Sequence, residues 1–258
     1  MKRLCVAFAI TTTLLGAGCM PPGSDTTTHP SSLEQNVWIP VSPELSRMEY
    51  TYGESASERL VLYRFVDETH HLRLVHDEAT PKAVSQWHVA NPSAEIVING
   101  FYFHEDWFPS GRMIADGAYN GDREFDADRS AYVILSPTFE ILDTAVEPIP
   151  ENVQDAAQSY PFLIKNGEAA ISEDSGLVAR RTFLGDDTAG FGYIGVVPFD
   201  EISLFELSHV LDAMDINWDD AVNLDGGPST GLSATTETVT ESYDSFTVVP
   251  NTVVVEPK

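Results

Sequence analysis

The chain has 258 residues, and its 40 acidic and 14 basic side chains give it a formal net charge of −26. Nucleic acid is bound by clustered cations, so this balance excludes it as a partner and also disfavours docking on anionic lipid. A bound anion would need a local site built from the few arginines. The acidic surface is compatible with a divalent cation such as calcium, but the sequence defines no ligand set for one.

The N-terminus has the pattern of an export signal. Two basic residues precede an apolar run, residues 4–15, which is too short to span a bilayer as a helix. Small residues at 16–18 come before Cys19, as in the signal of a bacterial lipoprotein. We therefore expect residues 1–18 to be removed and Cys19 to carry lipid, which would hold the exported protein in the cell envelope, at the outer membrane or the periplasmic face. An ordinary secretory signal, which would release the protein, is the alternative.

A tether and one domain follow the signal. Residues 19–32 are rich in Pro, Ser, Thr and Gly, which is typical of a flexible tether. No second linker or internal repeat interrupts residues 33–258, so we expect a single domain there. The only other cysteine, Cys5, lies in the signal, so the exported domain would contain no disulfide.

The first half of the domain predicts a hairpin, a helix and a strand. Two β-like runs, 59–66 and 70–76, are separated by a short turn and predict the hairpin. Thr80 as N-cap and Pro81 at the first helical position predict a helix to about residue 90. A short apolar strand, 94–98, follows.

Loops and hairpins are predicted for the middle of the chain. The polar, Gly- and Asp-rich segment 109–129 predicts a long surface loop. Strands 131–135 and 139–142 predict a hairpin, and strand 162–165 leads into the hairpin turn Asn166-Gly167.

The last third contains the clearest helix and completes the fold prediction. Ser203 begins it with a capping box, and apolar residues recur at helical spacing as far as Met214. Strands are predicted at 181–184, 191–197, 220–224, 246–249 and 252–255. The elements together predict an α+β fold of mixed, largely antiparallel β-sheets flanked by two or three helices in a single domain.

A carboxylate and two glycines follow the strand at 220–224. Gly226 and Gly227, after Asp225, let the backbone approach a ligand and present N–H groups to an anion, and Ser229 and Thr230 add hydroxyls. A plain Asp-Gly turn is the alternative. The segment also reads G-x-S-x-G, but no helix is predicted after it and the last histidine precedes it, which argues against a serine hydrolase.

A second cluster follows the strand at 94–98. Asn99 offers an amide, and Phe101, Tyr102 and His104 come after it, a composition suited to sugar hydroxyls and sugar faces. At least one of Phe101 and Phe103 is expected in the core instead. His104 has no partner at metal-ligand spacing and is expected to be solvated or hydrogen-bonded.

Arginines and histidines supply the remaining candidates. Arg180-Arg181 is the only adjacent pair of cations after the signal, and an arginine can hold a phosphate through two parallel hydrogen bonds. A surface ion pair is the alternative in so acidic a chain. Histidines 70, 71 and 76 are expected on a surface strand rather than around zinc. The acidic segment 116–128 lacks the carboxylate order of an EF-hand, so at most loose calcium binding is expected there.

Taken in chain order, several segments resemble the motifs of the phosphodiester glycosidase family. Residues 99–103 resemble its Asn-Gly-aromatic motif, 160–167 its strand-and-turn motif, and 181–185 its Arg-Thr-x-x-Gly motif. The helix at 203–214 with residues 221–230 resembles its helix leading into Leu-Asp-Gly-Gly-x-Ser-Thr, and 249–251 its last motif. The resemblance extends from about residue 83 to the C-terminus. It departs in having one glycine before Phe101, and in Pro228 where a third glycine is common.

The resemblance implies a hydrolase that cleaves the bond between a sugar's anomeric carbon and a phosphodiester oxygen. In this hypothesis Arg181 binds the phosphate, Asp225 activates water or stabilises an oxocarbenium-like sugar, and Asn99 holds a sugar hydroxyl. The substrate-binding set would be Thr182, Gly226, Gly227, Ser229, Thr230, Phe101, Tyr102 and His104. Asp116 and Asp187 are candidates for a second carboxylate, and whether the anomeric centre is inverted or retained stays open.

Two other functions are compatible with the same residues. One is a non-catalytic envelope lipoprotein that binds glycans or phosphoglycans in this cleft. The other is a phosphodiesterase that breaks the P–O bond on the far side of the bridging oxygen. The identity of the sugar and of the group esterified to the phosphate is not readable from the sequence.

Overall fold

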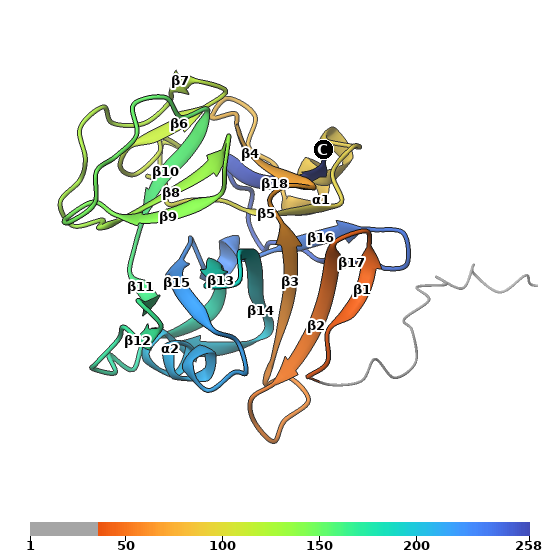
Figure 1. The fold of residues 1–258 in the computed structure, drawn as a ribbon. Coiled ribbons are helices and arrows are strands. Elements are labelled where there is room, and N and C mark those ends of the chain that lie inside the picture. Colours follow the sequence, from red (N-terminus) through yellow and green to blue (C-terminus); the bar gives the residue numbers. More distant parts are fainter. Residues whose placement is uncertain (1–35) are drawn as a thin grey trace, which may run out of the picture. The chain divides into compact units, whose positions relative to one another are not determined.

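Antiparallel strands build most of the structure, a computed structural model that describes residues 36–258 (Figure 1). The predicted signal, the lipidated Cys19 and the tether to residue 32 lie outside the described residues. Residues 36–258 lie within one compact unit. Within residues 36–258, no helix is long and apolar enough to cross a membrane.

The largest sheet has eight strands. In spatial order they are β1 (Ile39–Ser42), β2 (Leu45–Thr51), β3 (Arg59–Val66), β14 (Phe191–Ser203), β13 (Val178–Asp187), β15 (Trp218–Asn223), β11 (Phe162–Lys165) and β12 (Glu168–Ala169). Successive residues of β3 enter different apolar clusters: Val61 packs in one and Leu62 in the other. Side chains alternate between the faces of a strand, so both faces of this sheet are buried.

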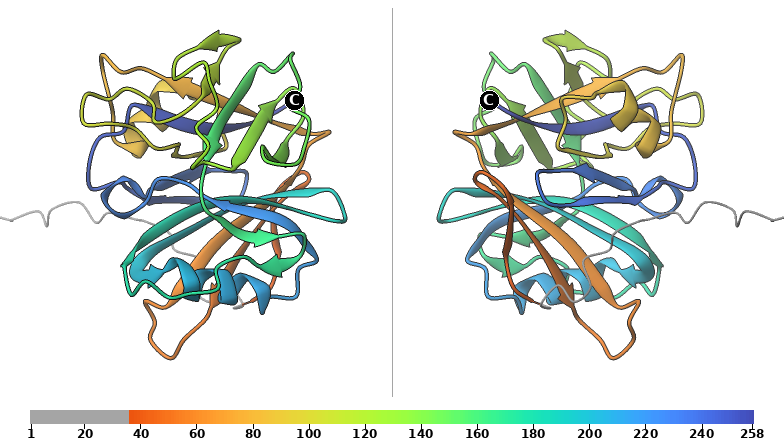
Figure 2. Two further views of the ribbon diagram at one scale, coloured as in Figure 1. Left: turned by 90° about the vertical axis from the view of Figure 1, so that its left-hand side faces the viewer. Right: turned by 90° about the vertical axis from the view of Figure 1, so that its right-hand side faces the viewer.

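Each face of the eight-stranded sheet has its own cover. Helix α2 (Leu204–Asp212) places Leu207 and Leu211 in the cluster on one face (Figure 2). The cluster on the other face is the main core, and it takes residues from all three sheets, among them Val61, Ile98 and Val133.

The other two sheets have five strands each. One has the order β7 (Ala118–Tyr119), β6 (Met113–Ala115), β10 (Asp155–Ser159), β8 (Ala131–Ser136) and β9 (Glu140–Asp143). The other has the order β17 (Thr240–Tyr243), β16 (Leu232–Thr235), β5 (Ile96–Asn99), β18 (Asn251–Pro257) and β4 (His70–His76). Helix α1 (Val84–Ala90) packs through Val84 and Trp87 on the sheet that contains β5.

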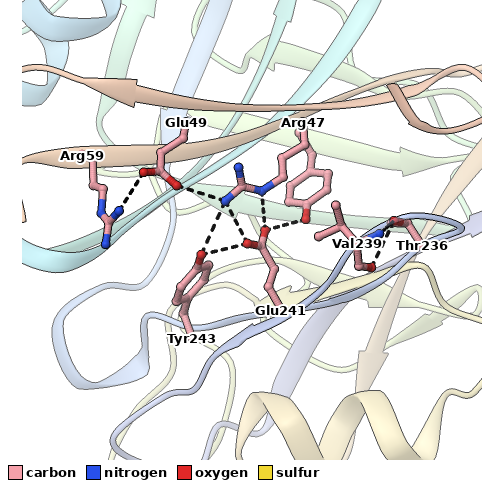
Figure 3. A network of polar contacts seen from close by, with 8 residues as sticks. Arg47, Glu49, Arg59, Thr236, Val239, Glu241 and Tyr243 are labelled. Atoms are coloured by element: carbon pink, nitrogen blue, oxygen red, sulfur yellow. Dashed lines mark hydrogen bonds and ion pairs between the residues drawn. The ribbon is translucent and has the colours of Figure 1, made fainter. Parts of the chain in front are cut away.

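A buried polar network ties the eight-stranded sheet to β17 (Figure 3). Arg47 of β2 donates from Nε and Nη2 to the two carboxylate oxygens of Glu241, each at 2.8 Å. The hydroxyls of Tyr63 and Tyr243 donate to the same carboxylate at 2.5 and 2.8 Å. Both charges of this pair are therefore inside the protein, and several hydrogen bonds join them to each other and to the two tyrosines, the condition under which a buried ion pair is tolerated.

Several predicted elements are confirmed. Ser203 caps α2, accepting from the Glu206 amide at 3.1 Å, while the Glu206 carboxylate accepts from the Ser203 amide at 3.0 Å. β8 and β9 form the predicted hairpin. β11 and β12 form another, and its turn residues Asn166 and Gly167 have φ of 50° and 80°.

The predicted hairpin of residues 59–66 and 70–76 is wrong. Both strands exist, but β3 pairs with β2 and β14, whereas β4 pairs with β18 in a different sheet. The short turn between them carries the chain from one sheet to another. Local alternation of apolar residues cannot distinguish this arrangement from a hairpin, because partner choice is made by distant strands.

The start of α1 and one late strand are also corrected. The helix begins at Val84 after the N-cap Ala83, not at Thr80-Pro81, because Lys82 pairs with Val249 in an isolated bridge. The segment 246–249 is not a strand. Its Phe246 is 80% exposed, and the loop is held by side-chain contacts described below.

The fold class is therefore more β-rich than predicted. The described residues contain two α-helices and one 3₁₀ turn, and their β-ladders are antiparallel, with a single isolated parallel bridge in place of the expected mixed sheets. The single domain with largely antiparallel sheets agrees with the prediction.

Candidate functional site

Three segments far apart in sequence meet where β5 and β15 end beside residues 180–182 of β13. β15 pairs with β13, and just past its last residue the Leu224 amide donates to the Thr182 carbonyl at 2.8 Å. β5 belongs to another sheet, yet its last residue, Asn99, reaches both of these segments. Asp225 lies two residues past the end of β15, and its backbone contacts Gly100 and Asn99 after β5, so it is held between two sheets.

Asn99 is the junction of the three segments. Its Nδ2 donates to the Asp225 carbonyl at 2.7 Å, and its Oδ1 accepts from the Thr182 hydroxyl at 2.7 Å and from the Gly231 amide at 3.1 Å. The side chain is fully buried. Both acceptor positions of its Oδ1 are occupied by protein donors, so this atom is not available to a sugar hydroxyl. Asn99 therefore positions the other residues of the site.

Asp225 presents a largely buried carboxylate. Its Oδ1 accepts from the Gly226 amide at 2.9 Å. Burial raises the pKa of Asp225 above its ordinary value, while hydrogen bonds from the Ser229 hydroxyl and the Gly226 amide offset part of that rise. No ion pair joins the carboxylate to a cation of the described residues. A carboxylate in this environment is more basic than a solvated one.

Arg181 offers an unpaired positive charge next to the backbone of Gly226. Nε donates to the Ile202 carbonyl at 3.0 Å and Nη2 to the Leu177 carbonyl at 2.9 Å, which fixes the guanidinium plane. Within residues 36–258, Nη1 has no hydrogen-bond partner, and no carboxylate lies within 4.0 Å of the group. In a chain with 40 acidic residues, a guanidinium group without a counterion is available to bind an anion.

The two glycines after Asp225 are required for different reasons. A Cβ on Gly226 would lie 2.9 Å from the Arg180 carbonyl and 3.9 Å from Nη1 of Arg181, so this position needs a close approach of chains. Gly227 has open space around it but a φ of +59°, the left-handed region. Of the two backbone amides, the one of Gly226 serves Asp225, and the one of Gly227 makes no hydrogen bond to the described residues.

Tyr102 closes the site on the side of Arg181. Its hydroxyl donates to the Tyr160 carbonyl at 3.0 Å and accepts from Nδ2 of Asn223 at 2.5 Å. Burial first, and then the nearby Asp225 carboxylate, raise the pKa of Tyr102 well above its ordinary value, so the phenol stays neutral. Asn223 was not predicted as a site residue. It precedes Asp225 by two positions, and its Oδ1 is buried without a partner among residues 36–258.

Other predicted residues lie around or outside this cluster. Thr182, Ser229 and Thr230 are buried beside Asp225 and Asn99, and the Thr230 hydroxyl has no partner in the described part. Phe101 is 1% exposed and belongs to the main core, so its expected contact with substrate is corrected. His104 is exposed in the turn that follows, and no hydrogen bond within residues 36–258 links its side chain to the cluster.

The two candidates for a second carboxylate are not brought to Asp225. Asp187 pairs with Trp218 at the far end of β13, six residues and about 20 Å along the strand from Arg181. Its carboxylate accepts from the amides of its own turn and from the Tyr193 hydroxyl. Asp116 lies in the turn between β6 and β7, in another sheet. Both residues are therefore set aside.

The remaining expectations concern metal ions and a serine nucleophile. His70 is buried against Glu95 and Thr69, which corrects its predicted surface position, and His71 contacts Glu256. Among residues 36–258, no group of three or more His, Cys, Asp or Glu is placed to hold a metal. The 3₁₀ turn Gly227–Ser229 leads into β16 and not into a helix, so the geometry of a serine-hydrolase elbow is absent from this described segment.

Comparison with known proteins identifies the family. A sequence model of the phosphodiester glycosidase family matches residues 92–256. None of the curated proteins compared with the chain is similar to it. Among solved structures, the fold resembles the catalytic domain of zebrafish N-acetylglucosamine-1-phosphodiester alpha-N-acetylglucosaminidase, auto-inhibited by its pro-peptide, with a TM-score of 0.61 and 15% identity over 84% of this chain and 85% of that one.

A hypothetical protein from Synechocystis has a similar fold, with a TM-score of 0.64 and 12% identity, over 86% of this chain and 63% of that one. At these identities the likeness concerns the fold alone. The family match covers the strand ends that carry Asn99, Arg181 and Asp225, together with the turn that follows Asp225. The chain belongs to the phosphodiester glycosidase family.

Proposed function

We propose that this protein hydrolyses the bond between the anomeric carbon of a sugar and a phosphodiester oxygen, in glycans of the cell envelope or its surroundings. Two observations in one turn carry the proposal: Asp225 is a largely buried carboxylate with a raised pKa, and Arg181, next to Gly226, has no counterion among the described residues. Family membership supports the reaction class.

The geometry divides the reaction between these two groups. The C1–O bond breaks with its electron pair going to the phosphate oxygen, which leaves as a stable anion and needs little help from a general acid. Nη1 of Arg181 and the amide of Gly227 are the donors available to that anion. A water molecule adds to C1, and its proton passes to the carboxylate of Asp225.

The test is release of free sugar by the purified full chain from sugar-1-phosphodiesters that differ in the sugar, with and without calcium. Asp225→Asn and Arg181→Ala should each lower kcat/KM by about a hundredfold or more. Asp219→Asn is the matched control, because Asp219 is an exposed carboxylate on β15, the strand that leads to Asp225, and it should retain wild-type turnover.

Labelled water separates the proposal from its rivals. Solvent oxygen should appear on the released sugar, whereas a phosphodiesterase would place it on the phosphate. If the protein bound these substrates saturably and released no sugar from any of them, the non-catalytic glycan-binding function would replace the hydrolase.

We further propose that the protein is exported and anchored through lipid on Cys19. The support is the N-terminal sequence pattern. Expressed in a bacterium, the wild type should sediment with membranes, and Cys19→Ala should move to the soluble fraction or remain uncleaved. A Cys5→Ala control should leave the distribution unchanged. Membrane association of a Cys19→Ala protein from which residues 1–18 have been removed would contradict the anchor.

A further inference from the structure

The loop after β17 holds an exposed aromatic ring next to the Asp225 turn. The Phe246 side chain is 80% exposed. The amides of Phe246 and Thr247 both donate to the carbonyl of Pro228, at 2.7 and 3.2 Å. Pro228 lies three residues after Asp225, so the ring stands at the rim of the site.

One face of that ring rests on a buried cation. The guanidinium carbon of Arg180 lies 4.1 Å from the Phe246 ring centroid. Arg180 is 6% exposed, and its Nη2 donates to the carbonyls of Thr230 and Asp244 at 2.6 and 3.2 Å. Nε and Nη1 are buried without a partner among residues 36–258, and no described carboxylate lies within 4.0 Å of the group. Burying an unpaired cation to support a ring that remains in water is unfavourable for folding alone.

The loop is also fixed from its other side. The Asp244 carboxylate accepts from the Ser85 amide and hydroxyl, at 3.0 and 2.6 Å. The Ser245 hydroxyl donates to the Thr247 carbonyl at 2.7 Å and accepts from the Val84 amide at 3.2 Å. The ring is therefore held in one orientation before any ligand arrives, which lowers the entropic cost of stacking on it.

We propose that the open face of Phe246 is a stacking surface for a pyranose ring of the substrate, in addition to the sugar whose C1 reacts. The inference rests on the proposed function and deepens it: the substrate class is a glycan with at least two rings. A cation below the ring and the free charge of Arg181 nearby disfavour a cationic ligand and suit a neutral sugar attached to a phosphodiester.

The experiment compares substrates and replacements of the ring in the full chain. Two sugar-1-phosphodiesters are compared: in the one-ring substrate the phosphate is esterified to methyl, and in the two-ring substrate it is esterified to a second sugar. The quantity measured is kcat/KM for the two-ring substrate divided by kcat/KM for the one-ring substrate. This ratio should fall about tenfold in Phe246→Ala and in Phe246→Leu. Leucine keeps apolar bulk but has no ring. Phe246→Trp should retain the ratio, and so should Val89→Ala, which alters an exposed apolar residue of α1. A Phe246→Leu ratio equal to that of the wild type would overturn the proposal.

A binding measurement keeps this outcome separate from failure of the hydrolase. Binding is measured by calorimetry in the Asp225→Asn background. One ligand is tri-N-acetylchitotriose, and the other, tested separately, is uridine monophosphate. Trisaccharide binding that weakens about tenfold in Phe246→Ala and survives in Phe246→Trp would support the stacking surface even if no variant released sugar. Loss of nucleotide binding alone in Phe246→Ala would overturn the assignment to pyranose. If the wild type released sugar but replacing Phe246 changed neither measurement, the proposed hydrolase function would stand and the stacking surface would be overturned.

Discussion

At the scale of single residues, the site depends on how Asp225 is solvated. A carboxylate after a strand is common, but this one combines burial with two hydrogen bonds from its own turn. Burial disfavours the charged form and the hydrogen bonds favour it, and burial is the larger effect. The balance sets the pH at which the carboxylate becomes a base.

The pH profile of kcat/KM should report this balance. The base is inactive when protonated, so activity should rise with pH through a pKa above the ordinary value of about 3.9 for aspartate. Ser229→Ala removes the hydroxyl that lowers the pKa of Asp225, so the acidic limb should move to higher pH. An unchanged or lower midpoint in Ser229→Ala, measured with the same substrate, would contradict the assignment.

The same shift has a consequence for stability. The pKa of Asp225 is higher in the folded state than in the unfolded chain, so folding favours its protonated form. Stability from this group is present below the unfolded pKa and is lost as pH rises through the folded one. Asp225→Asn should therefore unfold at a urea concentration equal to or above that of the wild type at pH 8, while losing turnover.

Gly227 tests whether the turn depends on its backbone conformation. With φ at +59° and no neighbour closer than 4.0 Å, alanine there meets strain and not a clash. Gly227→Ala should lower the free energy of unfolding by about 1–2 kcal/mol, measured by urea denaturation. Gly227→Asn should lose less, because asparagine tolerates the left-handed region better. Equal losses in the two variants would exclude strain as the cause.

At the scale of elements, the site is made by the ends of β5 and β15 beside β13, and Asn99 joins the three strands. Each strand was predicted within a few residues, and so were the polar residues that follow β5 and β15. The role of Asn99 was not predictable, because whether an amide faces a ligand or a neighbouring loop depends on which strand ends lie beside it. The pairing that brings Thr182 to Leu224 and Gly231 to Asn99 decides this.

Removing that junction should affect folding and turnover together. Asn99→Ala leaves the Thr182 hydroxyl and the Gly231 amide without their buried partner, which should cost about 2–4 kcal/mol of unfolding free energy and lower kcat. Asn217→Ala, at an exposed position, is the control and should change neither. If Asn99→Ala instead raised KM alone and left stability intact, Asn99 would be a sugar ligand after all.

At the scale of the whole molecule, a buried polar network links two sheets beside the main core. Arg47 and Glu241 are 194 residues apart in the chain, and the side chains of both are almost fully buried. The pair lies between β2 and β17, so it joins the first part of the described chain to the last. A buried pair of this kind is sensitive to the loss of one partner.

The two partners should therefore not behave additively. Glu241→Ala should lower the free energy of unfolding by about 3–5 kcal/mol, because it leaves the Arg47 charge buried and uncompensated. The double variant Arg47→Met with Glu241→Met should lose much less, since it removes both charges and keeps apolar volume. Urea unfolding of both proteins checks this, and a double variant as unstable as Glu241→Ala would show that the pairing is not the cause.

The sequence alone determined local structure where local interactions decide it. The capping box of α2, the Asn166-Gly167 turn and the short strands are encoded within a few residues, so they were predictable. Asp225 beside two glycines and the adjacent cations Arg180-Arg181 are local patterns as well, so the sequence alone could name Asp225 and Arg181 as candidates. The acidic balance that argues against nucleic acid needs composition alone.

Only the tertiary structure decided what depends on distant partners. It separated β3 from β4 and moved the start of α1 to Val84, two residues after the bridge between Lys82 and Val249. It buried Phe101 in the core while leaving Phe246 in water. It also set Asp187 at the far end of its strand from Arg181. Strand pairing and burial arise from contacts across more than a hundred residues, and these contacts determine which polar groups are free to bind a substrate.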